Sequence, residues 1–360
     1  MENSEKNLPQ EAVQEQAPHK RRVRYAGKYP KRYEEKYKEL DPIKYQEIAD
    51  HVKAKGNTPA GTHIPICVNE ILDILDIQPG QNGCDCTLGY GGHTERMLEK
   101  LQGQGHLCGL DADPIESEKT KARLQALGYK EDILSVILTN FKDIDQVAQQ
   151  HGKFDFILAD LGVSSMQLDN PARGFSYKFD GPLDLRMNPQ KGKPAYERLR
   201  EMERDEIEGM LIENADEPYA AEIAKTLSSD LKSGYPVETT LALRRIIEKA
   251  LAFLPKNRQK TEVKKSCARV FQALRIDVNE EFEVLYELLE KLPAVLKPGG
   301  KVVILTFHSG EDRLVKKSFK WHFNEGDYSD FAREIIRPSA KECAENPRAK
   351  STKLRWAIKA

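Results

Sequence analysis

The 360-residue sequence contains no long apolar run. No window approaches 18 consecutive apolar residues, and the N-terminus lacks the apolar core of a signal peptide. This absence predicts no membrane span and a cytoplasmic location. Cysteine is scarce, with six residues and no CxxC pair, so we expect small buried thiols and neither a disulfide framework nor a metal site. No sign of charge dominates, because 56 Lys and Arg stand against 57 Asp and Glu, and the net charge identifies no partner.

Hydrophobic residues make up 39% of the chain, enough for a substantial core, but they are sparse near its start. We interpret residues 1–60 as a basic, partly disordered extension. Within it, Lys20–Lys38 contains nine Lys and Arg and four tyrosines. Such a segment can bind nucleic acid through phosphates and stacked bases, or it can be a solvated arm whose tyrosines pack on the domain surface. The sequence leaves both interpretations open.

From His63 onward, short apolar runs alternate with amphipathic segments, a pattern typical of an α/β domain with helices on both faces of a parallel sheet. The expected strands are residues 82–88, 105–113, 133–141 and 154–162. After residue 195 the pattern is helical throughout until about residue 265, which predicts an inserted helical domain. One long helix over 268–296, a strand at 301–307, a helix at 308–323 and a terminal strand at 353–359 then complete the sheet domain. The predicted organisation is a first α/β part with a polar loop at 61–190, a helical insertion at 191–265 and a second α/β part at 266–360.

A glycine-rich turn follows the first expected strand. That strand ends at Asp85, and Gly89, Gly91 and Gly92 then precede a helix, which brings bare backbone amides and a helix N-terminus up to a ligand. The second strand ends at Asp111, about 20 residues further on, where a carboxylate can bind both ribose hydroxyls. A purely structural turn with a satisfied surface aspartate is the alternative.

The turn departs from the dinucleotide fingerprint. The third glycine of GxGxxG would stand at position 94, but the sequence has Thr94. S-adenosylmethionine has no phosphate to bind, and close glycine amides with an acidic strand end suit its ribose and amino-acid moiety. The fourth strand stops at Asp160 on the same edge of the sheet, where it could pair with the cofactor ammonium or lie near a reacting amine. The polar loop 170–188 that follows reads as an active-site loop.

These motifs together resemble the bacterial RsmH/MraW family of ribosomal RNA methyltransferases. The resemblance spans His63 to Ala360, and its motifs are "GYGGHT", "DADP", "ADLGVSSMQLDNPARGFSYKFDGPLDLRMNP", "RVFQALRIDVNEE", "LKPGGKVVILTFHSGEDRLVK" and "ENPRAKSTKLRWA". It implies a class I, Rossmann-like methyltransferase sheet with an inserted all-helical domain. It also implies transfer of a methyl group from S-adenosyl-L-methionine to the exocyclic N4 amine of a cytidine in 16S ribosomal RNA, as naked RNA or in the small subunit.

The resemblance assigns cofactor contacts to Gly91, Gly92, His93, Asp111, Phe141, Asp160 and Gln167. For catalysis the first candidate is Asp160, as the acceptor that localises the amine lone pair. His308 is a further candidate, and a satisfied structural histidine is an equally good interpretation of it. The residues that could contact RNA phosphates are Arg173, Lys178, Arg186 and Arg348.

Three alternatives stay open. A nicotinamide-dependent dehydrogenase is disfavoured by Thr94 and by the absence of a hydride-transfer constellation. A non-catalytic RNA-binding assembly factor is favoured only by the basic extension and by departures from the family pattern around the site, where Tyr90 and Ala112 each replace a usual arginine. An enzyme of the same family could also act on a different RNA or base. A homodimer is neither indicated nor excluded.

Overall fold

The computed structural model describes residues 65–360, which belong to the unit His63–Ala360. The predicted N-terminal extension, including Lys20–Lys38, lies outside the described residues. Within the described range, no helix is both long enough and apolar enough to cross a membrane.

The centre of the structure is a seven-stranded sheet in the order β3-β2-β1-β4-β5-β7-β6. Every pairing among the first five strands of this order is parallel, whereas β7 is antiparallel to β5 and β6 is antiparallel to β7. The strands are β1 (Asn82–Asp85), β2 (His106–Asp111), β3 (Leu134–Leu138), β4 (Phe154–Asp160), β5 (Leu296–Thr306), β6 (Tyr328–Phe331) and β7 (Lys353–Lys359). The predicted α/β class is confirmed, with an antiparallel pair added at one edge.

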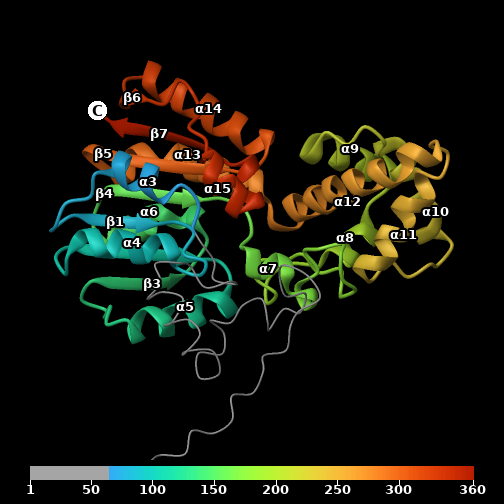
Figure 1. Ribbon diagram of the computed structural model, residues 1–360, viewed down its shortest axis with the longest axis horizontal. Helices are drawn as coiled ribbons and strands as arrows, with labels where there is room; N and C mark the ends of the chain where they lie inside the picture. Colours follow the sequence, from blue (N-terminus) through green and yellow to red (C-terminus); the bar gives the residue numbers. More distant parts are fainter. Residues whose placement is uncertain (1–64) are drawn as a thin grey trace, which may run out of the picture. The chain divides into compact units, whose positions relative to one another are not determined.

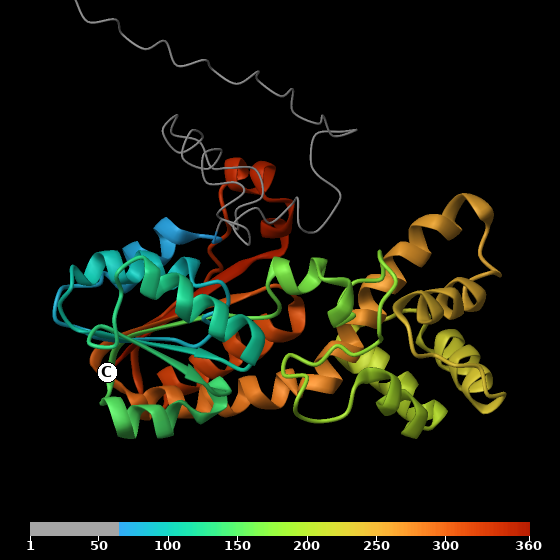
Figure 2. The same ribbon diagram turned by 90° about the horizontal axis from the view of Figure 1, so that it is seen from below.

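Helices cover both faces of this sheet, as Figures 1 and 2 show. Alternate residues of each strand pack on opposite sides, so Leu107 contacts the layer of α3 and α4 while Cys108 belongs to the layer of α6 and α13. The first layer contains α3 (Val68–Leu75), α4 (Gly92–Leu101) and α5 (Pro114–Ala126). The second contains α6 (Ile144–His151), α13 (Glu281–Val295) and α14 (Ser309–Asn324). Burial on both faces explains why the strands read as continuous apolar runs.

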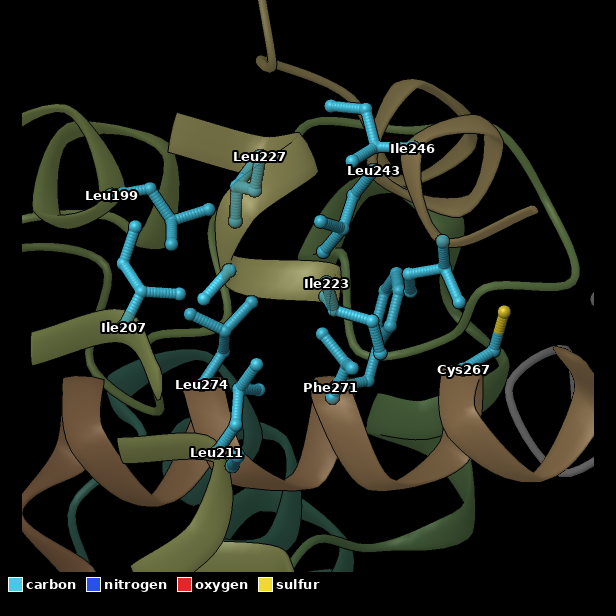
Figure 3. Close-up of a cluster of buried hydrophobic side chains, with 14 of the residues drawn as sticks. Leu199, Ile207, Leu211, Ile223, Leu227, Leu243, Ile246, Cys267, Phe271 and Leu274 are labelled. Carbon is cyan, nitrogen blue, oxygen red and sulfur yellow. The ribbon is translucent and has the colours of Figure 1, made fainter. Parts of the chain in front are cut away.

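A helical insert interrupts the sheet between β4 and β5. Its helices are α8 (Ala195–Glu201), α9 (Arg204–Ala215), α10 (Ala220–Lys232), α11 (Thr240–Ala250) and α12 (Lys256–Asn279). They enclose a hydrophobic cluster of their own, to which Ile223, Leu243 and Phe271 contribute fully or almost fully buried side chains (Figure 3). The predicted insert is therefore present. Its boundary at residue 265 stays a prediction, since α12 continues through that position.

The expected single helix over 268–296 is wrong. α12 ends at Asn279, and α13 begins at Glu281, because Glu280 between them adopts the left-handed conformation with φ 51°. The Arg275 guanidinium before the break donates to the Glu281 carboxylate after it, with Nε to Oε1 at 2.8 Å. Helix-favouring residues on both sides hide such a break from a pattern analysis. The break brings both charged side chains to the carboxyl end of the sheet.

Short elements complete the chain. α7 (Ser165–Asp169) and the 3-10 turn η3 (Pro171–Arg173) begin the polar loop after β4, and α15 (Ala340–Glu345) with η4 (Pro347–Ser351) precedes β7. A further 3-10 turn, η2 (Phe141–Asp143), follows β3. These elements surround the edge at which β1, β2 and β4 end, each in an aspartate. Parallel strands that end together define the usual ligand position of an open α/β sheet.

Candidate active site

A cavity of about 360 Å³ opens at this carboxyl edge. Its walls come from the glycine turn, the ends of β2 and β4, and the segment from Leu161 to Leu168. The break between α12 and α13 closes another side with Arg275, Asn279 and Glu281, and Arg348 of η4 reaches in from the C-terminal part. Segments from both sides of the helical insert thus meet around one crevice, which is the geometry of a binding site for a small molecule.

The glycine turn is held in place by the neighbouring strand. Gly89 has a φ of 49°, and its N–H donates to Oδ2 of Asp111 at 2.8 Å. Gly91 has a φ of 79° and is the N-cap of α4. A Cβ atom at Gly91 would lie 2.8 Å from Cγ2 of Thr120, so a larger residue would push the turn away from α5. As an uncapped helix N-terminus, the first amides of α4 are available to an anionic group such as a carboxylate.

Asp85 and Thr94 form a pair beneath the turn that the sequence analysis missed. Asp85 is 1% exposed, and Oγ1 of Thr94, which is fully buried, donates to its Oδ2 at 2.6 Å. The backbone N–H of Thr87 donates to the other carboxylate oxygen at 3.1 Å. Burial raises the pKa of Asp85, and these hydrogen bonds partly oppose that rise. Thr94 is thus the donor that ties α4 to the end of β1, and its departure from the dinucleotide fingerprint has a structural reason.

Asp111 lies where the ribose carboxylate is expected. Its Oδ2 accepts from Gly89, and its Oδ1 accepts from the N–H of Asp113 at 2.8 Å. Burial raises the pKa of Asp111 to about 7. Each carboxylate oxygen offers two lone pairs, so the group retains acceptor capacity for two hydroxyls that enter the cavity.

Asp160 lines the same cavity, and one oxygen of its carboxylate is unsatisfied. Its Oδ1 is buried and has no hydrogen-bond partner among residues 65–360, while its backbone N–H donates to Oγ1 of Thr87 at 2.7 Å. Burial raises the pKa of the carboxyl to about 6, and the nearby His93 opposes the rise. A buried carboxylate oxygen without a donor is rare unless a ligand supplies one.

His93 is the only cationic or potentially cationic group that pairs with Asp160 in the described part of the chain. Its Nδ1 lies 3.6 Å from Oδ2 of Asp160, and its Nε2 lies 2.9 Å from the carbonyl oxygen of Ile66. Since a carbonyl only accepts, Nε2 must carry a proton, and Nδ1 then faces the carboxylate. The ring of His93 therefore lies where it can orient the Asp160 carboxylate.

Phe141 and Gln167 also line the cavity. Phe141 is partly exposed at the start of η2 and packs against the core at the end of β3. Gln167 is 9% exposed, and both ends of its amide are used: Oε1 accepts from the N–H of Ser164, and Nε2 donates to Asp113. The structure therefore brings all seven predicted cofactor residues to one crevice, and their contacts with a cofactor stay predictions.

His308 lies just behind the cavity wall. Its Nε2 is 3.2 Å from Oε1 of Glu311, and its ring contacts Phe282. Glu311 itself lines the cavity, as does Glu281. Ligand atoms of His308, Glu281 and Glu311 lie within 4.8 Å of one another, a spacing that a metal ion could use, but Arg275 already neutralises Glu281. This contact pattern is that of a histidine held in an ion-pair network.

The predicted RNA contacts differ in their surroundings. Arg173 is 8% exposed and donates to Asp113 at 2.7 Å and to two main-chain carbonyls, so its guanidinium has little freedom to bind a phosphate. Arg186 pairs with Asp184, and Arg348 pairs with Asp169. Lys178 is exposed. Their roles toward RNA stay predictions, and Arg173 has a clear structural role that the sequence analysis missed.

The electrostatics of the crevice favour a cationic ligand. Within residues 65–360, no Lys or Arg forms an ion pair with Asp85, Asp111 or Asp160, and both arginines that line the cavity are bound to other carboxylates. A pyrophosphate would be repelled here, whereas an ammonium or a sulfonium would be attracted. Fold and site together define a class: an open α/β enzyme with a crevice for a positively charged nucleoside, which is the property of a class I methyltransferase.

Comparison with known proteins agrees with this class. Residues 60–360 match the sequence model of the MraW methylase family. The ribosomal RNA small subunit methyltransferase H 1 of Agathobacter rectalis is 62% identical over 348 residues, which cover 97% of this chain and 100% of that relative. The ribosomal RNA small subunit methyltransferase H 2 of Alkaliphilus metalliredigens is 58% identical over 94% of this chain and 97% of its own. The chain belongs to the MraW methylase family and is an S-adenosylmethionine-dependent methyltransferase, as the sequence predicts.

Replacing Thr94 with Val should lower both the stability of the protein and its affinity for the cofactor. The valine has nearly the same shape but no hydroxyl, so one oxygen of the buried Asp85 loses its donor. We expect the free energy of unfolding to fall by about 1–3 kcal/mol and cofactor affinity to fall with it. Denaturant titration and calorimetry measure the two effects. Thr94→Ser keeps the hydroxyl and is the matched control, and equal behaviour of the two variants would contradict the role given to this contact.

Proposed function

We propose that this chain transfers the methyl group of S-adenosylmethionine to the exocyclic N4 amine of a cytidine in 16S ribosomal RNA of the small subunit. The names of its relatives support the RNA substrate. The observation that carries the chemistry is the carboxylate of Asp160, which lines the cavity and whose buried Oδ1 has no donor among residues 65–360. An amino group is the donor that such an oxygen needs, and both the methyl donor and a cytidine carry one.

The residues of the crevice fit the cofactor in three places. The Gly92 and His93 amides at the start of α4 would hold its carboxylate, since the Gly91 amide already donates to the carbonyl of Leu88. The acceptor capacity left on Asp111 would bind its ribose hydroxyls, and Phe141 would cover its adenine. When bound, S-adenosylmethionine supplies a methyl group on a positively charged sulfur, and the uncompensated carboxylates of this edge would stabilise that charge.

The protein's main task in the transfer is positioning. The N4 lone pair of cytosine is delocalised into the ring, so the enzyme must hold the nitrogen in line with the methyl group and provide an acceptor for its hydrogen. Asp160 would accept that hydrogen bond through Oδ1, which localises the lone pair, while His93 fixes the other oxygen. His308 touches Glu311 and not the cavity, and it would act on the reaction only through that carboxylate.

A base paired or stacked in RNA must be splayed out to reach this depth. The loop 170–188 and the helical insert border the entrance and would hold the flanking nucleotides. Lys178 is exposed and can meet a phosphate directly. Arg186 and Arg348 each use part of their guanidinium on an acid and retain further donors for phosphate oxygens.

The alternatives are weaker on physical grounds. A dinucleotide would place its pyrophosphate against uncompensated carboxylates. A non-catalytic RNA-binding factor would have no need for a cavity-lining carboxylate with an unsatisfied oxygen. A different RNA or base within the same family stays the main competing proposal.

A cytoplasmic location and a homodimer are hypotheses, and sedimentation of the full chain tests the second.

The test of this function is a map of base methylation in the ribosomal RNA of a strain that lacks the gene. We expect mass spectrometry to find one N4-methylcytidine missing from 16S RNA and restored by the intact gene, but not by the gene carrying Asp160→Asn. An unchanged methylation map, or the loss of a different modified base, would contradict the proposal.

Asp111→Ala should nearly abolish cofactor binding. The variant removes the acceptor proposed for two ribose hydroxyls and also frees the Gly89 amide from its partner. Two hydrogen bonds to a charged acceptor correspond to a loss of roughly 100-fold or more in affinity. Calorimetry with S-adenosylmethionine measures it. Asp132→Ala, at an exposed position just before β3 and away from the carboxyl edge, is the control that should bind as the wild type does. Unchanged affinity in Asp111→Ala would refute the assignment.

Cofactor affinity should fall as the solution becomes acidic. The pKa values of Asp160 and Asp111 are raised to about 6 and about 7, so both carboxyls gain protons as the pH drops through this range and no longer attract a cation. We expect the affinity measured by calorimetry to weaken between about pH 8 and about pH 5. Asp160→Asn should bind more weakly at the alkaline end and lose part of this pH dependence. An affinity independent of pH in the wild type would contradict the charge argument.

A further inference from the structure

The outward face of α14 carries four basic side chains that the chemistry of the crevice does not use. Arg313, Lys316, Lys317 and Lys320 are all exposed and recur at the i, i+3, i+4, i+7 spacing of a single helix face. Within the part of the chain that the structure describes, none of them forms an ion pair with an acidic side chain within 4.0 Å. Four adjacent positive charges without counter-charges repel one another, so this face does not contribute to stability.

The opposite face fixes the direction in which these charges point. Val315, Phe319 and His322 are buried against the sheet layer, so the basic side chains must project into solvent. The acids of α14 leave them uncompensated, since Glu311 is buried at the cavity and Asp312 pairs with Arg355. The neighbouring α13 exposes three glutamates, Glu283, Glu287 and Glu290. Glu290 lies 3.9 Å from His322 of α14, and no ion pair within 4.0 Å joins any of the three to the four basic side chains.

A large aromatic side chain lies beside these charges. Trp321 is 51% exposed, and it follows Lys317 by one helical turn. Its ring contacts His322 edge-on at 4.6 Å between centroids, which holds the indole while leaving much of it in solvent. An exposed indole leaves apolar surface in water, which is unfavourable. Beside lysines, however, it can bind single-stranded RNA, because unpaired bases stack on the aromatic ring and the lysines neutralise phosphates.

The basic face begins at the active site. α14 starts directly after β5, and Glu311 in its first turn lines the cavity. Arg313 to Lys320 then extends about 10 Å along the helix, away from the cavity mouth. α14 lies along the sheet domain and is not part of the helical insert (Figure 1). A polymer whose target nucleotide occupies the crevice could therefore continue along this helix.

We propose that the outward face of α14 is a second contact surface for the substrate RNA, with the four basic residues on its phosphates and Trp321 stacked on an unpaired base. The proposal rests on the proposed function for the identity of the RNA, and it adds a binding surface in the sheet domain to the loop and insert around the entrance. Charge complementarity and the exposed indole both favour single-stranded or irregular RNA over an acidic protein.

The test compares two triple variants of the full chain. Lys316→Gln/Lys317→Gln/Lys320→Gln removes three charges from α14. Lys119→Gln/Lys121→Gln/Lys130→Gln removes three charges from α5 and the turn after it, on the opposite face of the sheet, and serves as the control. Binding of intact small ribosomal subunits is measured over a salt series. Losing three phosphate contacts should weaken binding roughly tenfold or more at low salt and reduce the salt slope by about two to three. The control should keep the wild-type slope.

Trp321 provides an independent arm. Trp321→Ala should weaken binding several-fold with no change in the salt slope, and Trp321→Phe should recover most of the loss because a phenyl ring still stacks. Calorimetry with S-adenosylmethionine should match the wild type for every variant, because none of these side chains lines the cavity. Unfolding curves check that every variant is folded.

The outcomes separate the two proposals. Wild-type binding by the α14 variant at every salt concentration would overturn the α14 surface, whatever the methylation result. Normal subunit binding without methylation by the wild type would contradict the proposed function and leave the binding comparison intact as the test of α14. Vesicles of anionic phospholipid form the last arm: if the α14 variant loses vesicle binding but keeps subunit binding, the face serves a membrane and the RNA proposal is wrong.

Discussion

The structure depends on holding three carboxylates together at one edge of a parallel sheet without lysine or arginine to neutralise them. Asp85, Asp111 and Asp160 end three strands of the sheet, so the fold itself brings their charges together. Backbone amides and hydroxyls stabilise the first two, and a histidine stands beside the third. Such an arrangement is unfavourable when the crevice is empty and more favourable when a cationic ligand enters, so these charges favour a cationic cofactor over an anionic one.

Two segments enclose this edge of the sheet: the loop after β4 and the break between α12 and α13. The fully buried carboxylate of Asp113 holds the loop after β4 in place, because it accepts hydrogen bonds from the side chains of Gln167 and Arg173. Asp113 also donates through its backbone to Asp111, so Asp111 and the loop after β4 share one support. On the other side, Glu280 adopts a left-handed conformation between α12 and α13, and residues on both sides of it line the cavity. The strand ends, the loop after β4 and the last helix of the insert therefore meet around one crevice.

The sequence predicts the features that repeat and misses those that depend on a single contact. Alternating apolar runs predict the sheet, and the strand-terminal Asp111 and Asp160 follow from parallel topology. From the sequence, Thr94 is only a departure from the GxGxxG fingerprint, because its hydrogen-bond partner Asp85 lies nine residues away on another element. Arg173 looked like a phosphate ligand because its partner Asp113 is 60 residues away in the sequence. β6 has only four residues, too few for a periodic pattern to indicate a strand.

The most direct test of the central claim is a crystal structure of the full chain grown with S-adenosylmethionine. The account predicts that both ribose hydroxyls lie within hydrogen-bond distance of Asp111. It also predicts the carboxylate of the cofactor at the first amides of α4, and an amino nitrogen, from the cofactor or from a bound cytidine, at Oδ1 of Asp160. A cofactor bound elsewhere, or bound here with its ribose turned away from Asp111, would contradict it.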